Sequence, residues 1–232
     1  MQAISNAEYT SLSAGARVLR KDSFGPKVLE RPDGKTLKLF RRKRRVSSAL
    51  VFPYARRFVK IARRLEARGV RTVSVEALYN VPALKRQVVL YDPLAGLSLR
   101  EEIAAASDRK VLIEAYLAFL LDLHARGIYF RSLHQANVIV GADGVLGLID
   151  VCETWLARGA LGPVLRARNL KHLLHDSVDA ATLTDYGLAR FLQGYIDGAG
   201  LGPLSSKLFR ALLRFQHPLL RRALLELSKR AD

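Results

Sequence analysis

The sequence predicts an α+β protein in two lobes, a small β-rich part at residues 1–93 and a mainly helical part at residues 94–232. Two observations predict it. Short β-type runs separated by turn residues fill most of the first third of the chain. After Asp92-Pro93 the chain changes to longer segments with helical spacing of apolar residues. The expected order is a β-hairpin, a strand, a helix, a hinge strand and then the helical part.

The clearest strand signal lies around Pro32-Asp33-Gly34, which is typical of a hairpin turn. The run that follows, residues 35–40, alternates in the way a half-buried strand does. Leu37 and Leu39 point to one side, and Lys38 and Phe40 point to the other. We therefore expect Lys38 on the face of the strand opposite to the two leucines.

One amphipathic helix is expected between Pro53, which suits a helix start, and Gly69, which suits a C-terminal cap. Its apolar positions follow helical spacing and are Phe58, Ile61, Ala62 and Leu65. The opposite side is strongly basic. The run RRKRR at residues 41–45 precedes this helix and reads either as a solvated loop or as an anion-binding patch.

Further helices are expected in the second part, together with one hairpin in the run NVIVGADGVLGLID. The helices are expected over residues 110–127, 168–176, 183–197 and 207–230. The last stretch, SKLFRALLRFQHPLLRRALLELSKR, carries seven Lys and Arg residues against one Glu. Its apolar face reads either as packing against the helical part or as part of a basic surface that lies on an anionic membrane. That face comprises Leu208, Leu212, Phe215 and Leu219, and Pro218 interrupts it.

The charge of the chain is unusual, because 38 Lys and Arg residues face 21 Asp and Glu residues, for a net charge of +17. Such a field favours anionic partners such as nucleic acid, acidic lipid or a phosphorylated glycan. Basic runs without interleaved aromatic residues disfavour nucleic acid. The single cysteine, Cys152, excludes an internal disulfide framework, and the five scattered His residues disfavour a Cys/His metal site.

The first 20 residues lack a basic segment followed by an apolar run, so the pattern of a signal peptide is absent. No window of about 18 residues is both apolar and free of charge. Even the most apolar stretch, residues 111–130, contains Glu114, Asp122 and His124. We therefore expect a cytoplasmic location, with a peripheral position on the inner membrane as a further expectation.

Three polar residues stand out at apolar strands: Lys38 inside TLKLF, Asn137 directly before VIV, and Asp150 at the end of VLGLID. Taken singly, the lysine reads as solvent-facing, and the other two read as caps or turn residues. Taken together, in this order and across a hinge, they are the parts that hold ATP and magnesium in protein kinases. Carboxylate and amide oxygens are also hard ligands suited to magnesium.

The chain resembles the protein-kinase-like superfamily. Within it, the chain is similar to the bacterial lipopolysaccharide core kinases that phosphorylate heptose or Kdo, and particularly to their toluene-tolerance relatives. The resemblance covers residues 18–176 and rests on six segments: TLKLF, RFVKIARRLEARGV, VVLYDPLAG, DLHARGIYFRSLHQAN, LGLIDV and RARNLKHLL. It implies a bilobal kinase-like fold.

The resemblance also implies roles for five residues. Lys38 is the phosphate-binding lysine, and Asn137 and Asp150 are the metal ligands for Mg²⁺. Tyr91 belongs to the hinge beside the adenine of ATP. Gly25 belongs to the loop that covers the phosphates, and it is the only glycine of KDSFGPK, so this part of the pattern is weak.

The catalytic loop departs from the family pattern, because His-Arg-Asp is replaced by Phe130-Arg131-Ser132. A neutral serine does not act as a base at pH 7, and the loss of a general base typically costs about 10²- to 10⁴-fold in rate. Phosphoryl transfer depends mainly on positioning and metal, so some activity can survive this loss. His134 is the alternative candidate for the base, and its other reading is a structural histidine. Arg131, Ser132 and His134 are thus the candidate catalytic residues.

Two supporting residues also depart from the pattern. Glu66 is the only acid on the first helix and lies near its end, so the usual glutamate partner of Lys38 is missing. Asn169 stands where the family's Arg-Asp-Leu segment, here Arg168-Asn169-Leu170, has its aspartate.

The sequence thus favours an ATP- and Mg²⁺-dependent phosphotransferase that acts on sugar hydroxyls of the lipopolysaccharide core. The alternative is a pseudokinase that serves as a regulatory or scaffold protein at the inner membrane. A third alternative is a module that binds an anionic surface, either a glycolipid or a membrane, without any nucleotide. Ser132 favours the second hypothesis over the first, and Asn137 and Asp150 favour the first two over the third.

Overall fold

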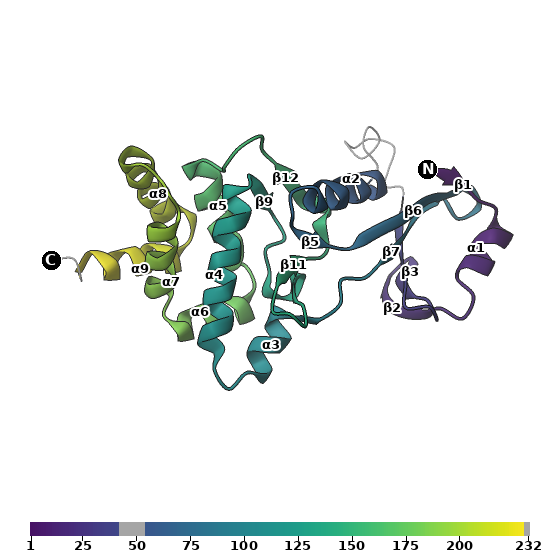
Figure 1. The fold of residues 1–232 in the computed structure, drawn as a ribbon, viewed down its shortest axis with the longest axis horizontal. Helices are drawn as coiled ribbons and strands as arrows, with labels where there is room; N and C mark the ends of the chain where they lie inside the picture. The colour runs from purple at the N-terminus through teal and green to yellow at the C-terminus, as the bar shows by residue number, and fades with distance from the viewer. Residues whose placement is uncertain (42–53, 230–232) are drawn as a thin grey trace. The chain divides into compact units, whose positions relative to one another are not determined.

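The computed structural model describes residues 1–41 and 54–229 (Figure 1). Pro53 and most of the basic run at residues 41–45 lie outside the described residues. The chain forms two compact units: residues 1–95 with 148–152 make the first, and residues 96–147 with 153 onward make the second. A multi-stranded sheet occupies the first unit and helices dominate the second, so the expected α+β class is confirmed.

The first unit is built on a six-stranded sheet with the strand order β1-β6-β7-β4-β3-β2. Only β1 runs parallel to its neighbour, β6. The strands are β1 (Gln2–Ala3), β2 (Arg17–Asp22), β3 (Gly25–Glu30), β4 (Thr36–Arg41), β6 (Ser74–Val81) and β7 (Arg86–Asp92). The short β5 (Arg71–Thr72) lies beside residue 148, because the Thr72 hydroxyl donates to the Leu148 carbonyl at 2.7 Å. Segment 148–152 is thereby joined to the first unit.

The two faces of this sheet are covered by different helices, α1 (Asn6–Leu12) and α2 (Tyr54–Glu66). Leu37 and Leu39 of β4 are buried in a core to which Tyr9 and Leu12 of α1 add partly buried side chains. On the opposite face, the Phe58 ring of α2 packs against residues of β4 and β7. The alternation expected for residues 35–40 is confirmed, and it directs Lys38 towards the α2 face.

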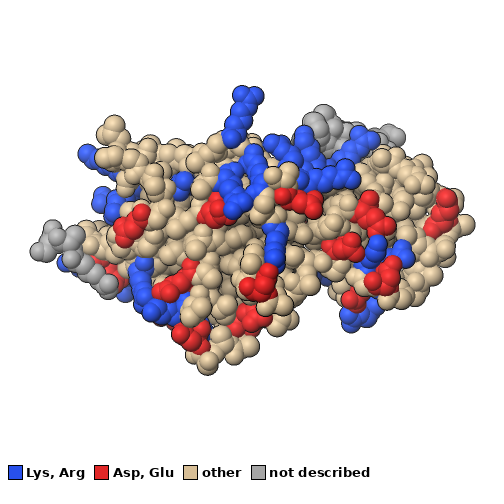
Figure 2. All heavy atoms as spheres, in the orientation of Figure 1, with Lys and Arg blue, Asp and Glu red and all other residues tan. Residues whose placement is uncertain are grey.

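The helix α2 has the amphipathic pattern that its sequence predicts. Its inner positions are buried and comprise Ala55, Phe58, Ile61, Ala62 and Leu65. Its outer positions are exposed cations and comprise Arg56, Arg57, Lys60, Arg63 and Arg64. The space-filling view shows this gathering of blue atoms over α2 (Figure 2).

The second unit consists mainly of helices and also contains short strands. The helices are α3 (Leu99–Ala105), α4 (Arg109–Ala125), α5 (Pro163–Leu173), α6 (Ser177–Tyr186), α7 (Leu188–Gly198), α8 (Pro203–Gln216) and α9 (Pro218–Lys229). The strands are β8 (Leu97–Ser98), β9 (Ile128–Phe130), β10 (Val138–Val140), β11 (Leu146–Leu148) and β12 (Thr154–Leu156). Strands β10 and β11 form the predicted hairpin. Helix α5 begins before the predicted residue 168, because Gly162-Pro163 is a favourable helix start.

Two long helices that the sequence predicted are each divided in two. The segment expected as one helix over 183–197 belongs to α6 and α7, which meet at Gly187 with a φ of 101°. The segment expected over 207–230 belongs to α8 and α9, which meet at His217. Gly187 ends a helix because a positive φ is open mainly to glycine. Pro218 starts a new helix because its ring cannot continue the preceding one.

The long helix α4 is central to the second unit, with Ile113, Tyr116, Leu120 and Leu123 buried on its inner side. It also carries Glu114, Asp122 and a fully buried His124. Within residues 1–41 and 54–229, no helix combines the length and the apolar character needed to cross a membrane.

Candidate functional site

The Lys38 ammonium and the Asp150 carboxylate form an ion pair in the first unit. Lys38 lies in the middle of β4, paired with β3 on one side and β7 on the other. Asp150 follows β11 and has a φ of 54°, a left-handed conformation that is uncommon outside glycine. Lys38 Nζ donates to Asp150 Oδ1 at 2.7 Å, although the two residues are 112 positions apart in sequence. The lysine side chain is 12% exposed and the aspartate side chain 50% exposed, so the carboxylate remains accessible to a ligand.

Three aromatic residues surround this pair, and together with it they form what we call the Lys38 cluster: Lys38, Asp150, Phe40, Phe58 and Tyr91. Lys38 Nζ lies 4.9 Å from the Phe58 ring centroid and 5.7 Å from that of Phe40. The Phe58 and Tyr91 centroids are 5.6 Å apart. Cation–π contacts of this kind hold an ammonium group in place.

The electrostatics of the Lys38 cluster are dominated by cations. Burial opposes ionisation of Asp150, but attraction by Lys38, Lys27 and Arg20 holds the pKa of its carboxyl below the ordinary value. The carboxylate is therefore ionised at neutral pH. Burial, with the nearby Asp150 charge, raises the pKa of Tyr91 to about 12, so its hydroxyl keeps its proton. Three cations around one carboxylate leave a positive excess that suits an anion.

The counter-ion of Lys38 is Asp150 and not an acid of α2. Glu66, the only acid on α2, is exposed at the end of that helix. Asp150 takes the position of counter-ion instead. No sequence pattern identifies this pairing, because it depends on how segment 148–152 lies against β4.

The turn that holds Gly25 connects β2 and β3, and Gly25 has a φ of 107°. A Cβ built on Gly25 meets nothing within 4 Å, so its conformation, and not lack of space, favours glycine. The carbonyl of the preceding Phe24 accepts a hydrogen bond from Arg86 at 2.8 Å. This contact fixes the turn against β7.

The predicted catalytic loop lies in the second unit between β9 and β10. The Ser132 carbonyl accepts from the His134 backbone N–H at 2.8 Å and from Asn137 Nδ2 at 2.9 Å. The amide of Asn137 is therefore oriented by the loop itself, and its oxygen is the atom that could bind a metal. Arg131 forms a long 3.5 Å ion pair with Glu153, and the two side chains are 59% and 45% exposed. Such a pair contributes about 0–1 kcal/mol to stability.

His134 is part of the same loop, and its ring centroid lies 6.4 Å from that of His175. Its Nδ1 atom is buried and has no hydrogen-bond partner among the described residues. No Asp or Glu occurs in the segment from Phe130 to Asn137. The role of His134 as a base stays a prediction.

Asp179 of α6 supports the loop and was missed by the sequence analysis. It is 1% exposed, and its Oδ2 accepts from the Gln135 backbone N–H at 2.8 Å. Its Oδ1 accepts from Arg100 Nε at 3.0 Å and from Arg100 Nη2 at 2.7 Å. Burial raises the pKa of the Asp179 carboxyl in spite of these donors. Asp176 and Asp179 stand at a helix start, so sequence alone suggests capping and not a buried support.

A buried chain of hydrogen bonds fixes the strand that enters the loop. Asn169 Nδ2 donates to the Phe130 carbonyl at 2.8 Å, so its Oδ1 accepts from His124 Nε2 at 3.0 Å. Burial lowers the pKa of His124 to about 4, which keeps the ring neutral. Its Nδ1 therefore accepts from the Tyr195 hydroxyl at 2.6 Å, which in turn accepts from Arg166 at 3.3 Å. Asn169 thus anchors β9.

The described residues contain no group of three or more His, Cys, Asp or Glu side chains that could hold a metal ion. Asn137 belongs to the second unit and Asp150 to the first, so the two predicted metal ligands are not brought together within one unit. A single carboxylate beside several cations fits Mg²⁺ only when phosphate oxygens supply further ligands, which is common for magnesium–nucleotide sites.

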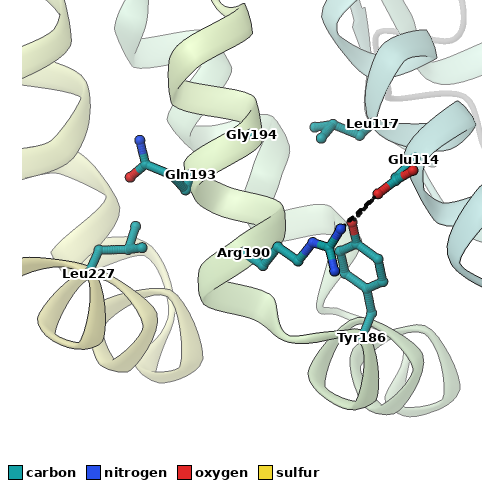
Figure 3. Close-up of a pocket in the computed structure, with 7 residues that line it drawn as sticks. All are labelled: Glu114, Leu117, Tyr186, Arg190, Gln193, Gly194 and Leu227. Atoms are coloured by element: carbon teal, nitrogen blue, oxygen red, sulfur yellow. Dashed lines mark hydrogen bonds and ion pairs between the residues drawn. The ribbon is translucent and has the colours of Figure 1, made fainter. Parts of the chain in front are cut away.

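A separate hollow of about 740 Å³ lies among the helices of the second unit (Figure 3). Arg190 Nη2 pairs with Glu114 Oε1 at 3.0 Å, and the Tyr186 hydroxyl donates to the same oxygen at 3.2 Å. These polar groups satisfy one another across the hollow. The hollow therefore lacks the unmatched charge that marks the Lys38 cluster.

Comparison with known proteins does not place the chain in a family. No protein-family model matches it, and no curated protein matches it. The likeness to the lipopolysaccharide core kinases therefore stays a prediction from the motifs, and the Lys38 cluster is the candidate site.

Proposed function

We propose that this protein binds magnesium–ATP at the Lys38 cluster and is a kinase-like phosphotransferase with a bilobal fold. The observation that carries the proposal is the 2.7 Å Lys38–Asp150 ion pair beside Arg20 and Lys27. A strand lysine and a strand-end aspartate are the two charged groups that such a site needs for phosphate and for metal. The cationic excess around them favours a polyphosphate ligand.

Each member of the ion pair has a ligand group that it could bind in place of its present partner. The Lys38 ammonium would bind phosphate oxygens, and the Asp150 carboxylate would bind Mg²⁺. Both charges stay compensated in this exchange, which avoids the cost of an unpaired charge in a half-buried site. The metal would neutralise charge on the transferred phosphoryl group. The hinge role of Tyr91 beside the adenine stays a prediction, since β7 pairs at this residue with both β4 and β6.

The acceptor in this proposal is a sugar hydroxyl of the lipopolysaccharide core. The acceptor class comes from the motif resemblance, and the net charge of +17 supports it because the core and its membrane are anionic. The assay is transfer of labelled phosphate from ATP to purified lipopolysaccharide core. The second candidate is a pseudokinase, and the specific observation in its favour is the absence of an acid from Phe130 to Asn137.

Restoring an acid to the loop separates these two functions. For a phosphotransferase, Ser132→Asp is expected to raise the transfer rate by about 10²- to 10⁴-fold, because it supplies a general base. Ser132→Asn introduces a side chain of nearly the same size as aspartate but without its charge. It is expected to leave the rate at the wild-type level. If neither the wild type nor Ser132→Asp transfers phosphate while both bind magnesium–ATP, the phosphotransferase is excluded and the pseudokinase stands.

A further inference from the structure

The helix α8 has apolar side chains on two opposite sides. Phe209 and Leu213 are fully buried and hold the helix on the second unit. Leu204, Leu208 and Phe215 lie on the other side and are 85%, 46% and 88% exposed. Leu208 and Phe215 belong to the predicted apolar face and are exposed, whereas Leu212 and Leu219 of the same face are partly buried. Side chains as exposed as those of Leu204 and Phe215 contribute little to the packing of the fold. Together they indicate an interaction surface.

These three residues form a continuous stripe. Their spacing of four and then seven residues returns to the same side of a helix, and the stripe is about 16 Å long at about 1.5 Å per residue. The exposed cations Lys207 and Arg214 flank it. Apolar side chains alternating with cations are typical of helices that lie in a membrane interface.

Helices α8 and α9 meet at the left of Figure 1, and residues from both line a cationic hollow near the end of this stripe. Its volume is about 470 Å³, and its lining includes Arg214, Arg221, Arg222 and Phe215. Within the part of the chain that the structure describes, none of these three arginines forms an ion pair with a carboxylate. A phosphate group is small enough to enter, and guanidinium groups bind phosphate in bidentate geometry.

We propose that the α8–α9 surface, defined as Leu204, Leu208 and Phe215 with Arg214, Arg221 and Arg222, binds an anionic lipid bilayer. The arginines contact the headgroup phosphates, and the apolar stripe enters the boundary between headgroups and acyl chains. Binding to a bilayer thus accounts for both the exposed apolar stripe and the three arginines. The proposal does not depend on the Lys38 cluster or on any nucleotide.

Charge decides between the bilayer and a second copy of the chain. A symmetric dimer through this surface would bring its unpaired arginines close to those of the partner, and like charges oppose such a contact. A nucleic acid would satisfy the arginines, but its phosphate backbone would leave the stripe of Leu204 to Phe215 in water. An anionic bilayer matches both the charge and the apolar side chains.

The test is sedimentation of the full chain with vesicles of phosphatidylcholine alone or with 30% phosphatidylglycerol added. Binding is expected only with the anionic vesicles. The triple variant Arg214→Gln, Arg221→Gln and Arg222→Gln is expected to weaken it about 100-fold, at about five-fold for each cation near an anionic surface. The double variant Leu204→Ser and Phe215→Ser is expected to weaken binding at least ten-fold. Both sites are exposed, so the fold is expected to remain intact.

The matched control removes the same charge from another helix. Arg56→Gln, Arg57→Gln and Lys60→Gln on α2 are expected to weaken vesicle binding less than five-fold. Equal losses in both triple variants would overturn the proposal, since they would assign binding to net charge alone. Two other results would also overturn it. One is a dimer that the Leu204→Ser and Phe215→Ser variant dissociates. The other is a wild-type protein that binds single-stranded RNA but not vesicles, with this RNA binding lost in the α8–α9 arginine variant and kept in the α2 variant.

Discussion

Replacing Asp179 with Ala is expected to lower the free energy of unfolding by about 2–4 kcal/mol. The side chain is 1% exposed and accepts three hydrogen bonds, one from the Gln135 backbone and two from Arg100. Its removal leaves the Gln135 N–H buried without an acceptor and takes the closer carboxylate from Arg100. Arg100 keeps its 3.0 Å contact with Asp176, which limits the loss. Urea denaturation followed by circular dichroism measures the change.

Two further variants define the cause. Asp179→Asn has one acceptor oxygen where the aspartate has two, so it cannot satisfy both Gln135 and Arg100 and is expected to be almost as damaging. Asp185→Ala removes an exposed acid from the same helix and is expected to change stability by less than about 0.5 kcal/mol. A loss below about 0.5 kcal/mol in Asp179→Ala would contradict the support role of this residue.

Acidification from about pH 7 to about pH 5 is expected to cost about 2 kcal/mol of stability through His124 alone. The pKa of this histidine is lowered from 6.5 to about 4 in the folded protein. The unfolded chain therefore binds a proton below 6.5, whereas the folded protein stays unprotonated down to about 4. The stabilisation that neutral His124 provides is thus complete above the unfolded-state pKa of 6.5. It is lost as the pH falls towards the folded-state pKa of about 4.

The measurement is the free energy of unfolding of the wild type and of His124→Gln at both pH values. His124→Gln is less stable at pH 7, because it breaks the chain from Tyr195 to Asn169, but its stability is expected to fall less with pH. Equal pH dependence in the wild type and in His124→Gln would show that His124 is not held neutral by burial.

The parts of the fold that the sequence predicted correctly are those that local patterns control. The turn at Pro32-Asp33-Gly34, the alternation of Leu37 and Leu39, and the buried positions of α2 each follow from a few neighbouring residues. Helix α1 was not predicted, although Ser5 and Glu8 form a capping box, which is a typical helix start. Local residues also mark the breaks between helices: Gly187 ends α6, and Pro218 begins α9.

The candidate site depended on contacts that sequence does not carry. Lys38 was singled out by its place in an apolar strand, but its partner Asp150 is set by tertiary structure. Asn169 was noted as a departure, and only its hydrogen bonds to His124 and Phe130 show what it supports. The burial of Asp179 could not be inferred, because an acid at a helix start normally faces water.

The central claim is that the Lys38 cluster binds magnesium–ATP, and the thermal unfolding midpoint tests it most directly. At 100 times its dissociation constant a ligand stabilises the folded state by about 2.7 kcal/mol. At this chain length that raises the midpoint by roughly 5–10 °C. The shift is expected to require Mg²⁺, to vanish in Asp150→Asn and to persist in Glu66→Gln, which alters an exposed acid of the same unit. No shift with magnesium–ATP, or an equal shift in Asp150→Asn, would contradict the account.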